Sequence, residues 1–190
     1  MRYNQIRETD IANGEGIGIA LFVQGCRFHC KNCFNPETWD FNGGKEWTQE
    51  VEDKFIELAS RPYIKRISIL GGEPLADKNL DGVLHLVNRF RLLFPQKSIW
   101  IYTGYKLEDI VFCKAVNDFA KGKDDFNTAI DKECNNIIRQ VIISQCDVLV
   151  DGRYINSQRN VSLKWRGSSN QRVINIQESL RKGEIILWTN

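Results

Sequence analysis

The chain has 190 residues, of which 42% are hydrophobic and 26% are charged. These proportions are typical of a soluble globular protein, and the length suits one domain better than two. The net charge of +2 gives no overall electrostatic reason to expect a nucleic acid or a membrane as partner. The first residues lack the apolar run of a signal peptide, and no window has the roughly 20 apolar residues that span a bilayer. We therefore expect one cytoplasmic domain of residues 1–190 that binds neither nucleic acid nor membrane.

The first predicted strand covers residues 17–24 and follows a polar segment that ends in a turn at residues 13–16. Apolar side chains fall on both faces of this strand, which is typical of a parallel strand buried on both sides. Three cysteines, Cys26, Cys30 and Cys33, come directly after it. In α/β proteins ligands bind at the C-terminal ends of parallel strands, so the position of these cysteines predicts a binding site in this loop.

The spacing of these cysteines indicates an inorganic centre, because soft thiolate ligands select zinc, copper(I) or iron–sulfur clusters. Three local thiolates leave one corner of a 4Fe-4S cluster open for a ligand that is not protein. A zinc site with a fourth ligand and three unrelated thiols are the alternatives. The possible fourth zinc ligands are His29, Cys113, Cys134 and Cys146. Six cysteines without a secretory signal favour a metal site in a reducing compartment over disulfides.

The next elements alternate between helix and strand. A helix begins after Thr48 as N-cap and ends at Arg61-Pro62, and a strand over residues 64–70 runs into Gly71-Gly72-Glu73-Pro74. A second amphipathic helix covers residues 80–94, capped by Asn79 or Asp77. A strand over residues 98–102 follows, with Thr103 after it. This order predicts right-handed crossovers and a parallel sheet.

The remainder of the chain is less regular. Residues 107–145 show weak periodicity and clustered charges, so we expect helical segments with a polar insertion at about 108–145. A strand at residues 147–150 leads into Asp151-Gly152-Arg153, and two short β-like segments are expected at residues 173–176 and 184–188.

The loops after the parallel strands are expected to meet at one edge of the sheet. Gly71 and Gly72 have no Cβ, which lets the backbone approach a ligand closely. Glu73 and the nearby carbonyl groups suit a cationic amine. An ordinary turn explains Gly71–Pro74 equally well when these residues are considered alone.

The cysteine spacing after the first strand, together with Gly-Gly-Glu-Pro after the second, is similar to that of radical S-adenosylmethionine enzymes. Further segments resemble the activating proteins of anaerobic ribonucleoside-triphosphate reductase. These segments are residues 23–26, 33–40, 101–105, 147–152 and 165–172. The resemblance covers nearly the whole chain outside residues 108–145.

The resemblance implies an α/β fold, a partial TIM-like β/α barrel, with the cluster at the C-terminal edge of its strands. Cys26, Cys30 and Cys33 would hold three irons of a 4Fe-4S cluster, and S-adenosyl-L-methionine would bind the fourth iron. Its amine would contact the loop of Gly71, Gly72, Glu73 and Pro74. The residues implied near the adenosine or a nearby cation are Asn32, Cys33, Phe34, Thr103, Asp151 and Arg153. Asn32 departs from the aromatic residue that many radical enzymes carry at that position.

The implied activity is reductive cleavage of S-adenosylmethionine, followed by removal of a hydrogen atom from a backbone glycine of the partner. The partner would be the large subunit of anaerobic ribonucleoside-triphosphate reductase, and the electron donor a protein such as reduced flavodoxin. Trp165–Arg172 would close the active site or dock the partner, unless it is a structural turn. The alternatives are an activase of another glycyl-radical enzyme, a small-molecule radical synthase, and a non-catalytic zinc-binding module.

Overall fold

The computed structural model describes residues 1–111 and 125–189 of an α/β protein built on one mixed seven-stranded sheet. Four central strands, β2, β4, β5 and β6, are parallel, and β1, β3 and β7 add antiparallel edges. The strand order is β3-β1-β2-β4-β5-β6-β7, so the sheet is open. The strands are β1 (Arg2–Asp10), β2 (Gly18–Val23), β3 (Lys45–Glu46), β4 (Arg66–Gly71), β5 (Ser98–Tyr102), β6 (Val148–Asp151) and β7 (Arg172–Asn175).

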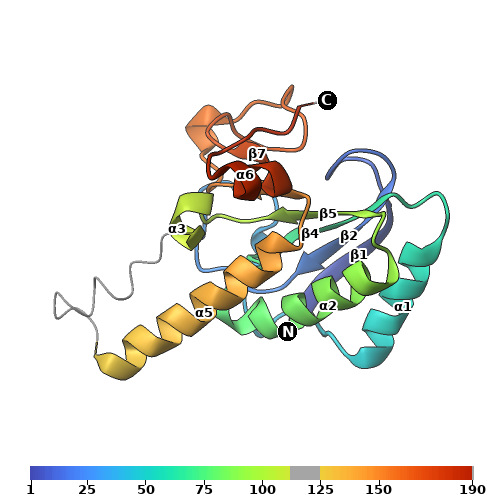
Figure 1. Cartoon of the computed structure of the whole chain (residues 1–190), viewed down its shortest axis with the longest axis horizontal. Helices are drawn as coiled ribbons and strands as arrows, with labels where there is room; N and C mark the ends of the chain where they lie inside the picture. Colours follow the sequence, from blue (N-terminus) through green and yellow to red (C-terminus); the bar gives the residue numbers. More distant parts are fainter. Residues whose placement is uncertain (112–124, 190) are drawn as a thin grey trace.

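Helices cover one face of the sheet, as Figure 1 shows for α1, α2 and α5. They are α1 (Gln49–Ser60), α2 (Leu80–Leu93), α3 (Leu107–Val111), α5 (Phe126–Ser144) and α6 (Ile176–Lys182). Short 3-10 turns occur at Pro36–Thr38, Asp77–Asn79 and Asn156–Gln158. Alternate residues of the strands, such as Ile19, Leu21 and Ile67, form the main core with the apolar faces of these helices. No helix in the described ranges is long and apolar enough to cross a bilayer.

The second face of the sheet has a different cover. Trp100 of β5 lies there with Val148 and Val150, and Trp165 and Trp188 pack against this group from loops. The ring centroids of Trp100 and Trp165 are 4.9 Å apart in an edge-on arrangement. Beyond Trp100, toward the C-terminal ends of the strands, this face of the sheet lines a pocket.

The central strands, helices α1 and α2, and the N-cap at Thr48 agree with the sequence-based predictions. The Thr48 side chain accepts a hydrogen bond from the Val51 amide. No strand was predicted in the polar start of the chain, whereas the structure has β1 at Arg2–Asp10. Backbone pairing with β2 and β3 holds this strand, while most of its side chains stay partly or fully exposed.

The β-like segment predicted at residues 184–188 is confirmed only in part, because it hydrogen-bonds to β7 through its backbone without forming a regular strand. Only Leu187 forms a bridge, with Ile174, and the regular element of this region is α6. Asn175 caps α6 by accepting from the Glu178 amide, and Gly183 ends it with φ 70°. In the region of the expected polar insertion the structure contains α3 and α5, while residues 112–124, including Cys113, lie outside the described residues.

Candidate functional site

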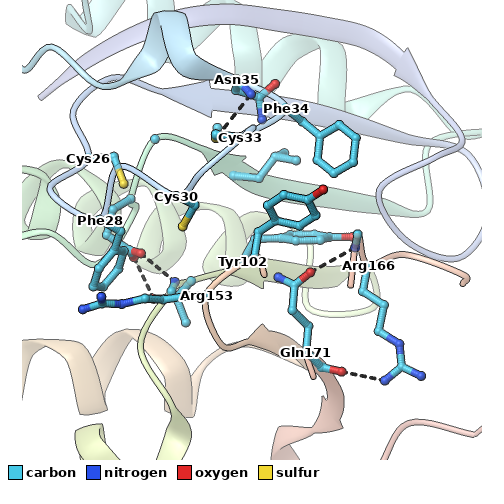
Figure 2. A pocket seen from close by; sticks show the side chains of 18 of the residues that line it. Cys26, Phe28, Cys30, Cys33, Phe34, Asn35, Tyr102, Arg153, Arg166 and Gln171 are labelled. Atoms are coloured by element: carbon cyan, nitrogen blue, oxygen red, sulfur yellow. Dashed lines mark hydrogen bonds between the residues drawn. The ribbon is translucent and has the colours of Figure 1, made fainter. Parts of the chain in front are cut away.

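A pocket of about 540 Å³ lies at the C-terminal ends of the four parallel strands. All four strand-end loops line it, so the topology brings together segments that are far apart in the sequence (Figure 2). Its lining includes Cys26, Cys30, Cys33, Gly71, Gly72, Glu73, Thr103, Gly104, Gly152 and Arg153. Phe34 of the cysteine loop also lines it, whereas the side chain of Asn32 is exposed and Pro74 is buried behind the loop.

The cysteine loop is held by backbone hydrogen bonds to the turn that follows it. The Gly25 amide donates to the Thr38 carbonyl at 2.8 Å, and the Cys26 amide donates to the Trp39 carbonyl at 3.0 Å. His29 and Asn32 have φ values of 45° and 56°, a left-handed conformation that is uncommon outside glycine. These contacts turn the loop so that its three cysteines line one pocket.

Phe28 anchors this loop to two other strand ends. Its ring packs edge-on to Tyr105, with centroids 5.0 Å apart, and the Arg153 guanidinium lies 4.3 Å from its centroid. A Cβ on Gly104 would come within 2.4 Å of the ring, so glycine is required there for the close approach. This contact could not be predicted from the sequence, because a single aromatic residue in a loop belongs to no helix or strand periodicity that would indicate what it packs against.

Burial in the loop disfavours the ionised form of two of the thiols, Cys26 and Cys30. Burial raises the pKa of Cys26 to about 11, and burial with the nearby Cys33 raises the pKa of Cys30. Cys33 Sγ accepts from the Asn35 amide at 3.4 Å. Cysteine binds iron as the thiolate, so binding of a cluster here would release the thiol protons. The positive charge of the irons would then compensate the negative charge of the thiolates.

Three of the four residues considered as a fourth zinc ligand lie in the described residues, and none of these three completes such a site; Cys113 lies outside them. The His29 ring stacks on Trp39, Cys134 is exposed on α5, and the buried Cys146 precedes β6 at the opposite end of the strands. Within residues 1–111 and 125–189 no three His, Cys, Asp or Glu side chains converge as ligands of one ion would. A 4Fe-4S cluster does not require convergence on one point, because each thiolate binds its own iron.

Glu73 is the carboxylate that lines the pocket, and it is 2% exposed. One of its oxygens accepts from the Thr103 hydroxyl at 2.7 Å and the Leu75 amide at 2.9 Å. The other accepts from the Gly104 amide at 2.7 Å. Burial raises the pKa of Glu73 to about 7, against these donors, which favour the ionised form. Thr103 therefore acts on the pocket by fixing Glu73.

The glycines of this loop serve packing between strand ends. A Cβ on Gly71 would lie 2.8 Å from Phe22, and one on Gly72 would lie 2.6 Å from the Gly25 carbonyl oxygen. Gly71 also has φ 102°, which disfavours any other residue. The missing Cβ atoms of Gly71 and Gly72 thus allow this loop to pack closely against the end of the neighbouring strand, at Phe22 and Gly25.

Asn79 joins the first two loops and was predicted only as a helix cap. Its side-chain amide donates to the Gln24 carbonyl at 3.0 Å and to the Glu73 carbonyl at 2.9 Å, and it makes no side-chain cap. Asp151 is likewise engaged inside the fold. It accepts from Arg172 and from the Leu107 amide, is 1% exposed, and does not line the pocket.

The segment Trp165–Arg172 forms the wall opposite the cysteines, as Figure 2 shows for Arg166 and Gln171. The Gln171 side chain accepts from the Gly167 amide at 3.0 Å and donates to the Gly152 carbonyl at 3.0 Å. Arg166 donates to the Gln171 carbonyl at 2.6 Å. These bonds fasten the wall to the end of β6.

Comparison of the sequence with known proteins identifies the family of this chain. Residues 12–174 match the family described as a 4Fe-4S single cluster domain. The chain is 38% identical over 173 residues to the anaerobic ribonucleoside-triphosphate reductase-activating protein of Vibrio cholerae, covering 90% of this chain and 96% of the relative. The chain belongs to this family of activating proteins.

Other members of the family include the activating protein of Escherichia coli strain K12, 36% identical over 90% of this chain and 96% of the relative. The activating protein of Enterobacteria phage T4 is 32% identical over 91% of this chain and 93% of its own length. The matched family supports an iron–sulfur cluster in this protein, in agreement with three thiols around one pocket.

Proposed function

We propose that the protein activates an anaerobic ribonucleoside-triphosphate reductase through radical chemistry on S-adenosylmethionine. The observation that carries this proposal is the meeting of three cysteines and the Gly71–Glu73 loop around one pocket. Membership of the activating-protein family supports the choice of partner. The partner is the large subunit of the reductase, and a protein such as reduced flavodoxin supplies the electron.

The donor set of the pocket fits a 4Fe-4S cluster with one open iron. Cys26, Cys30 and Cys33 would each hold one iron, and no described His, Cys, Asp or Glu joins them as a fourth ligand. When bound, the cluster and S-adenosylmethionine would supply the radical chemistry that removes a hydrogen atom from a backbone glycine of the reductase. The protein supplies orientation and excludes other hydrogen donors.

The residues of the chain hold S-adenosylmethionine in place. Its ammonium group would bind at the carbonyls of Gly71 and Gly72 beside Glu73, whose negative charge favours a cation. Thr103 and the Gly104 amide keep Glu73 fixed. The backbone of Asn32–Phe34 and the Arg153 side chain would border the adenosine. Asp151 would act indirectly, by holding Arg172 at the base of the pocket wall.

The architecture and location follow from the same proposal. Four parallel strands with the cysteine loop at their C-terminal edge suit a partial TIM-like barrel of the radical S-adenosylmethionine type. We propose that the whole chain forms this one domain. A cytoplasmic location provides the reducing environment in which exposed thiols and a cluster persist.

The test is anaerobic reconstitution with iron and sulfide, followed by reduction in the presence of S-adenosylmethionine. We expect uptake of about four irons per chain and release of methionine and 5′-deoxyadenosine. Addition of the reductase should then produce the electron paramagnetic resonance signal of a glycyl radical. Uptake of one zinc without iron, and no cleavage, would contradict the proposal and favour the zinc module.

A further inference from the structure

Four cationic side chains each lie over an aromatic ring that lines the pocket, and two of them, Arg7 and Arg153, line it themselves. Arg7 is 4.4 Å from the centroid of Phe22 and Arg153 is 4.3 Å from that of Phe28. Arg159 is 5.5 Å from the centroid of Phe34, and Lys164 is 5.9 Å from that of Trp165. All four rings line the pocket. We call Arg7, Arg153, Arg159 and Lys164 the cationic collar.

The collar is not neutralised by the protein itself. All four side chains are exposed, and none forms an ion pair with a carboxylate in the part of the chain that the structure describes. Other arginines, such as Arg66, Arg89 and Arg172, are paired with Asp or Glu. The pocket contains Glu73, but internal donors already occupy both of its oxygens.

The aromatic rings give the collar a defined geometry. A cation held over a ring loses part of its side-chain freedom before any partner arrives, and the attraction is worth about 0.5–1 kcal/mol at an exposed site. Lys and Arg side chains with no such support lose more entropy when they bind a carboxylate. The net charge of the chain is only +2, so this concentration of positive charge is local.

The place of the collar identifies what it meets. In the proposed reaction a glycine of the reductase reaches the pocket through its mouth, so the protein surface around that glycine must lie against the collar. Four unpaired cations spread over β1 and the segment between β6 and β7 suit an extended protein surface better than one small anion. Exposed apolar side chains beside these cations, Val161 at 85% between β6 and β7 and Phe34 at 56% under Arg159, are typical of an interface.

We propose that the cationic collar is a docking surface for an acidic region of the reductase that surrounds its glycine. This inference rests on the proposed function for the identity of the partner. Opposite charges would steer the two proteins together and set the orientation in which the glycine enters. The contribution of the collar should therefore be strongest at low ionic strength.

The test uses the reconstituted full-length protein and the anaerobic reductase of the same organism. We would measure the Kd of the complex anaerobically at several NaCl concentrations for the wild type and for Arg159→Glu/Lys164→Glu. The matched control is Lys54→Glu/Lys182→Glu, which makes the same charge change at exposed positions of α1 and α6 away from the pocket. We expect the collar variant to raise Kd by about tenfold or more at low salt, and by less at high salt.

The radical yield gives a second readout. For each variant the rate of glycyl-radical formation is divided by its own rate of 5′-deoxyadenosine release without the reductase. A fall in this ratio for the collar variant, with no fall for the control, supports the docking surface. Equal Kd values for wild type, collar variant and control would overturn it, as would a wild-type Kd that does not change with salt.

The two proposals fail in different ways. A collar variant that loses partner-free cleavage and radical formation in parallel, with an unchanged Kd, would show that these cations serve the cofactor. That result would overturn the docking surface and leave the proposed function intact. Absence of cleavage in the wild type would contradict the proposed function, whereas the Kd measurements would still decide whether the collar binds the reductase.

Discussion

Cys30 and Cys134 are the same residue type in two environments that predict opposite behaviour. Cys30 lines the pocket with Cys26 and Cys33, whereas Cys134 is exposed on α5. We expect Cys30→Ala to abolish the cluster absorbance and the cleavage of S-adenosylmethionine, since a cubane held by only two thiolates dissociates. Iron analysis and the visible spectrum after reconstitution check this. Cys134→Ala is the control, and a normal iron content in Cys30→Ala would refute the ligand assignment.

Thr103 tests whether Glu73 must be held in place. Thr103→Val keeps the shape of the side chain but removes the hydrogen bonds that its oxygen makes with Glu73 and with the Tyr105 amide. We expect a loss of about 1–3 kcal/mol in the free energy of unfolding, because buried groups lose a partner. The KM for S-adenosylmethionine should rise with little change in kcat, as measured by 5′-deoxyadenosine release.

Thr103→Ser provides the rescue for this experiment. It retains the hydroxyl, so it should restore most of the affinity for S-adenosylmethionine if the hydrogen bond to Glu73 is what matters. If Thr103→Ser behaves like Thr103→Val, the methyl group of threonine and its packing carry the effect instead.

At the scale of elements, Arg172 ties the start of β7 to α3 and to the end of β6. Its guanidinium donates to both oxygens of Glu108, at 2.8 and 2.6 Å, and also to the buried Asp151. The hydrogen bonds from Arg172 lower the pKa of Glu108 from 4.5 to about 2. A carboxyl group with a lowered pKa in the folded state stabilises the fold when it is ionised.

Because the pKa of Glu108 is lowered in the folded protein, the stability of the fold should fall as Glu108 becomes protonated. The stabilisation by Glu108 is complete above about pH 4.5, the unfolded value, and disappears as the pH falls through about 2. Urea unfolding of the metal-free protein should therefore show wild type more stable than Glu108→Gln at pH 6, with the difference shrinking toward pH 2. The glutamine variant does not titrate and serves as its own control for acid effects elsewhere. A difference that stays constant with pH would refute the role of this ion pair.

The elements that could be predicted from the sequence are those whose local pattern matches their burial. β2 is apolar on both faces and buried throughout, and the cysteines and Gly71–Glu73 follow strands of this kind. β1 could not be predicted, because backbone pairing rather than a buried face defines it. α6 is 7 residues long, too short for a periodic signal against the β-branched residues before it.

The site was predictable only where one short segment contains it. Asn79 reaches Gln24 across 55 residues of sequence, and Gln171 reaches Gly152 across 19 residues. Such contacts depend on the topology that brings strand ends together. The cysteine motif needs no such knowledge, since its three cysteines are contained in one loop.

At the scale of the whole molecule, the two faces of the sheet differ in how they are covered. Helices α1, α2 and α5 bury one face, whereas a loop supplies most of the cover of the other. That loop is held by its own hydrogen bonds, such as the Ser169 amide to the Gln158 carbonyl at 3.0 Å, and by Trp165 against Trp100. We expect the loop to open in local fluctuations that leave the helical side folded.

Trp165→Ala should separate these two parts of the molecule. Loss of the indole removes packing on Trp100 but leaves the main core intact, so amide hydrogen exchange should accelerate in residues 158–171 with a small change in the urea midpoint. Phe90→Ala, in the core of α2, is the comparison, and it should cost about 3–5 kcal/mol of global stability. Equal losses of global stability in the two variants would show that the loop is part of the main cooperative unit.

The same variant links this architecture to function. Trp165 lines the pocket wall opposite the cysteines and supports Lys164 of the cationic collar. Its removal should therefore leave the cluster content near normal, while radical formation on the reductase falls more than partner-free cleavage does. If both activities fall equally, the wall acts on the cofactor side of the pocket. A fall confined to the reductase reaction would mean that the helical face preserves the cluster while the loop face receives the partner.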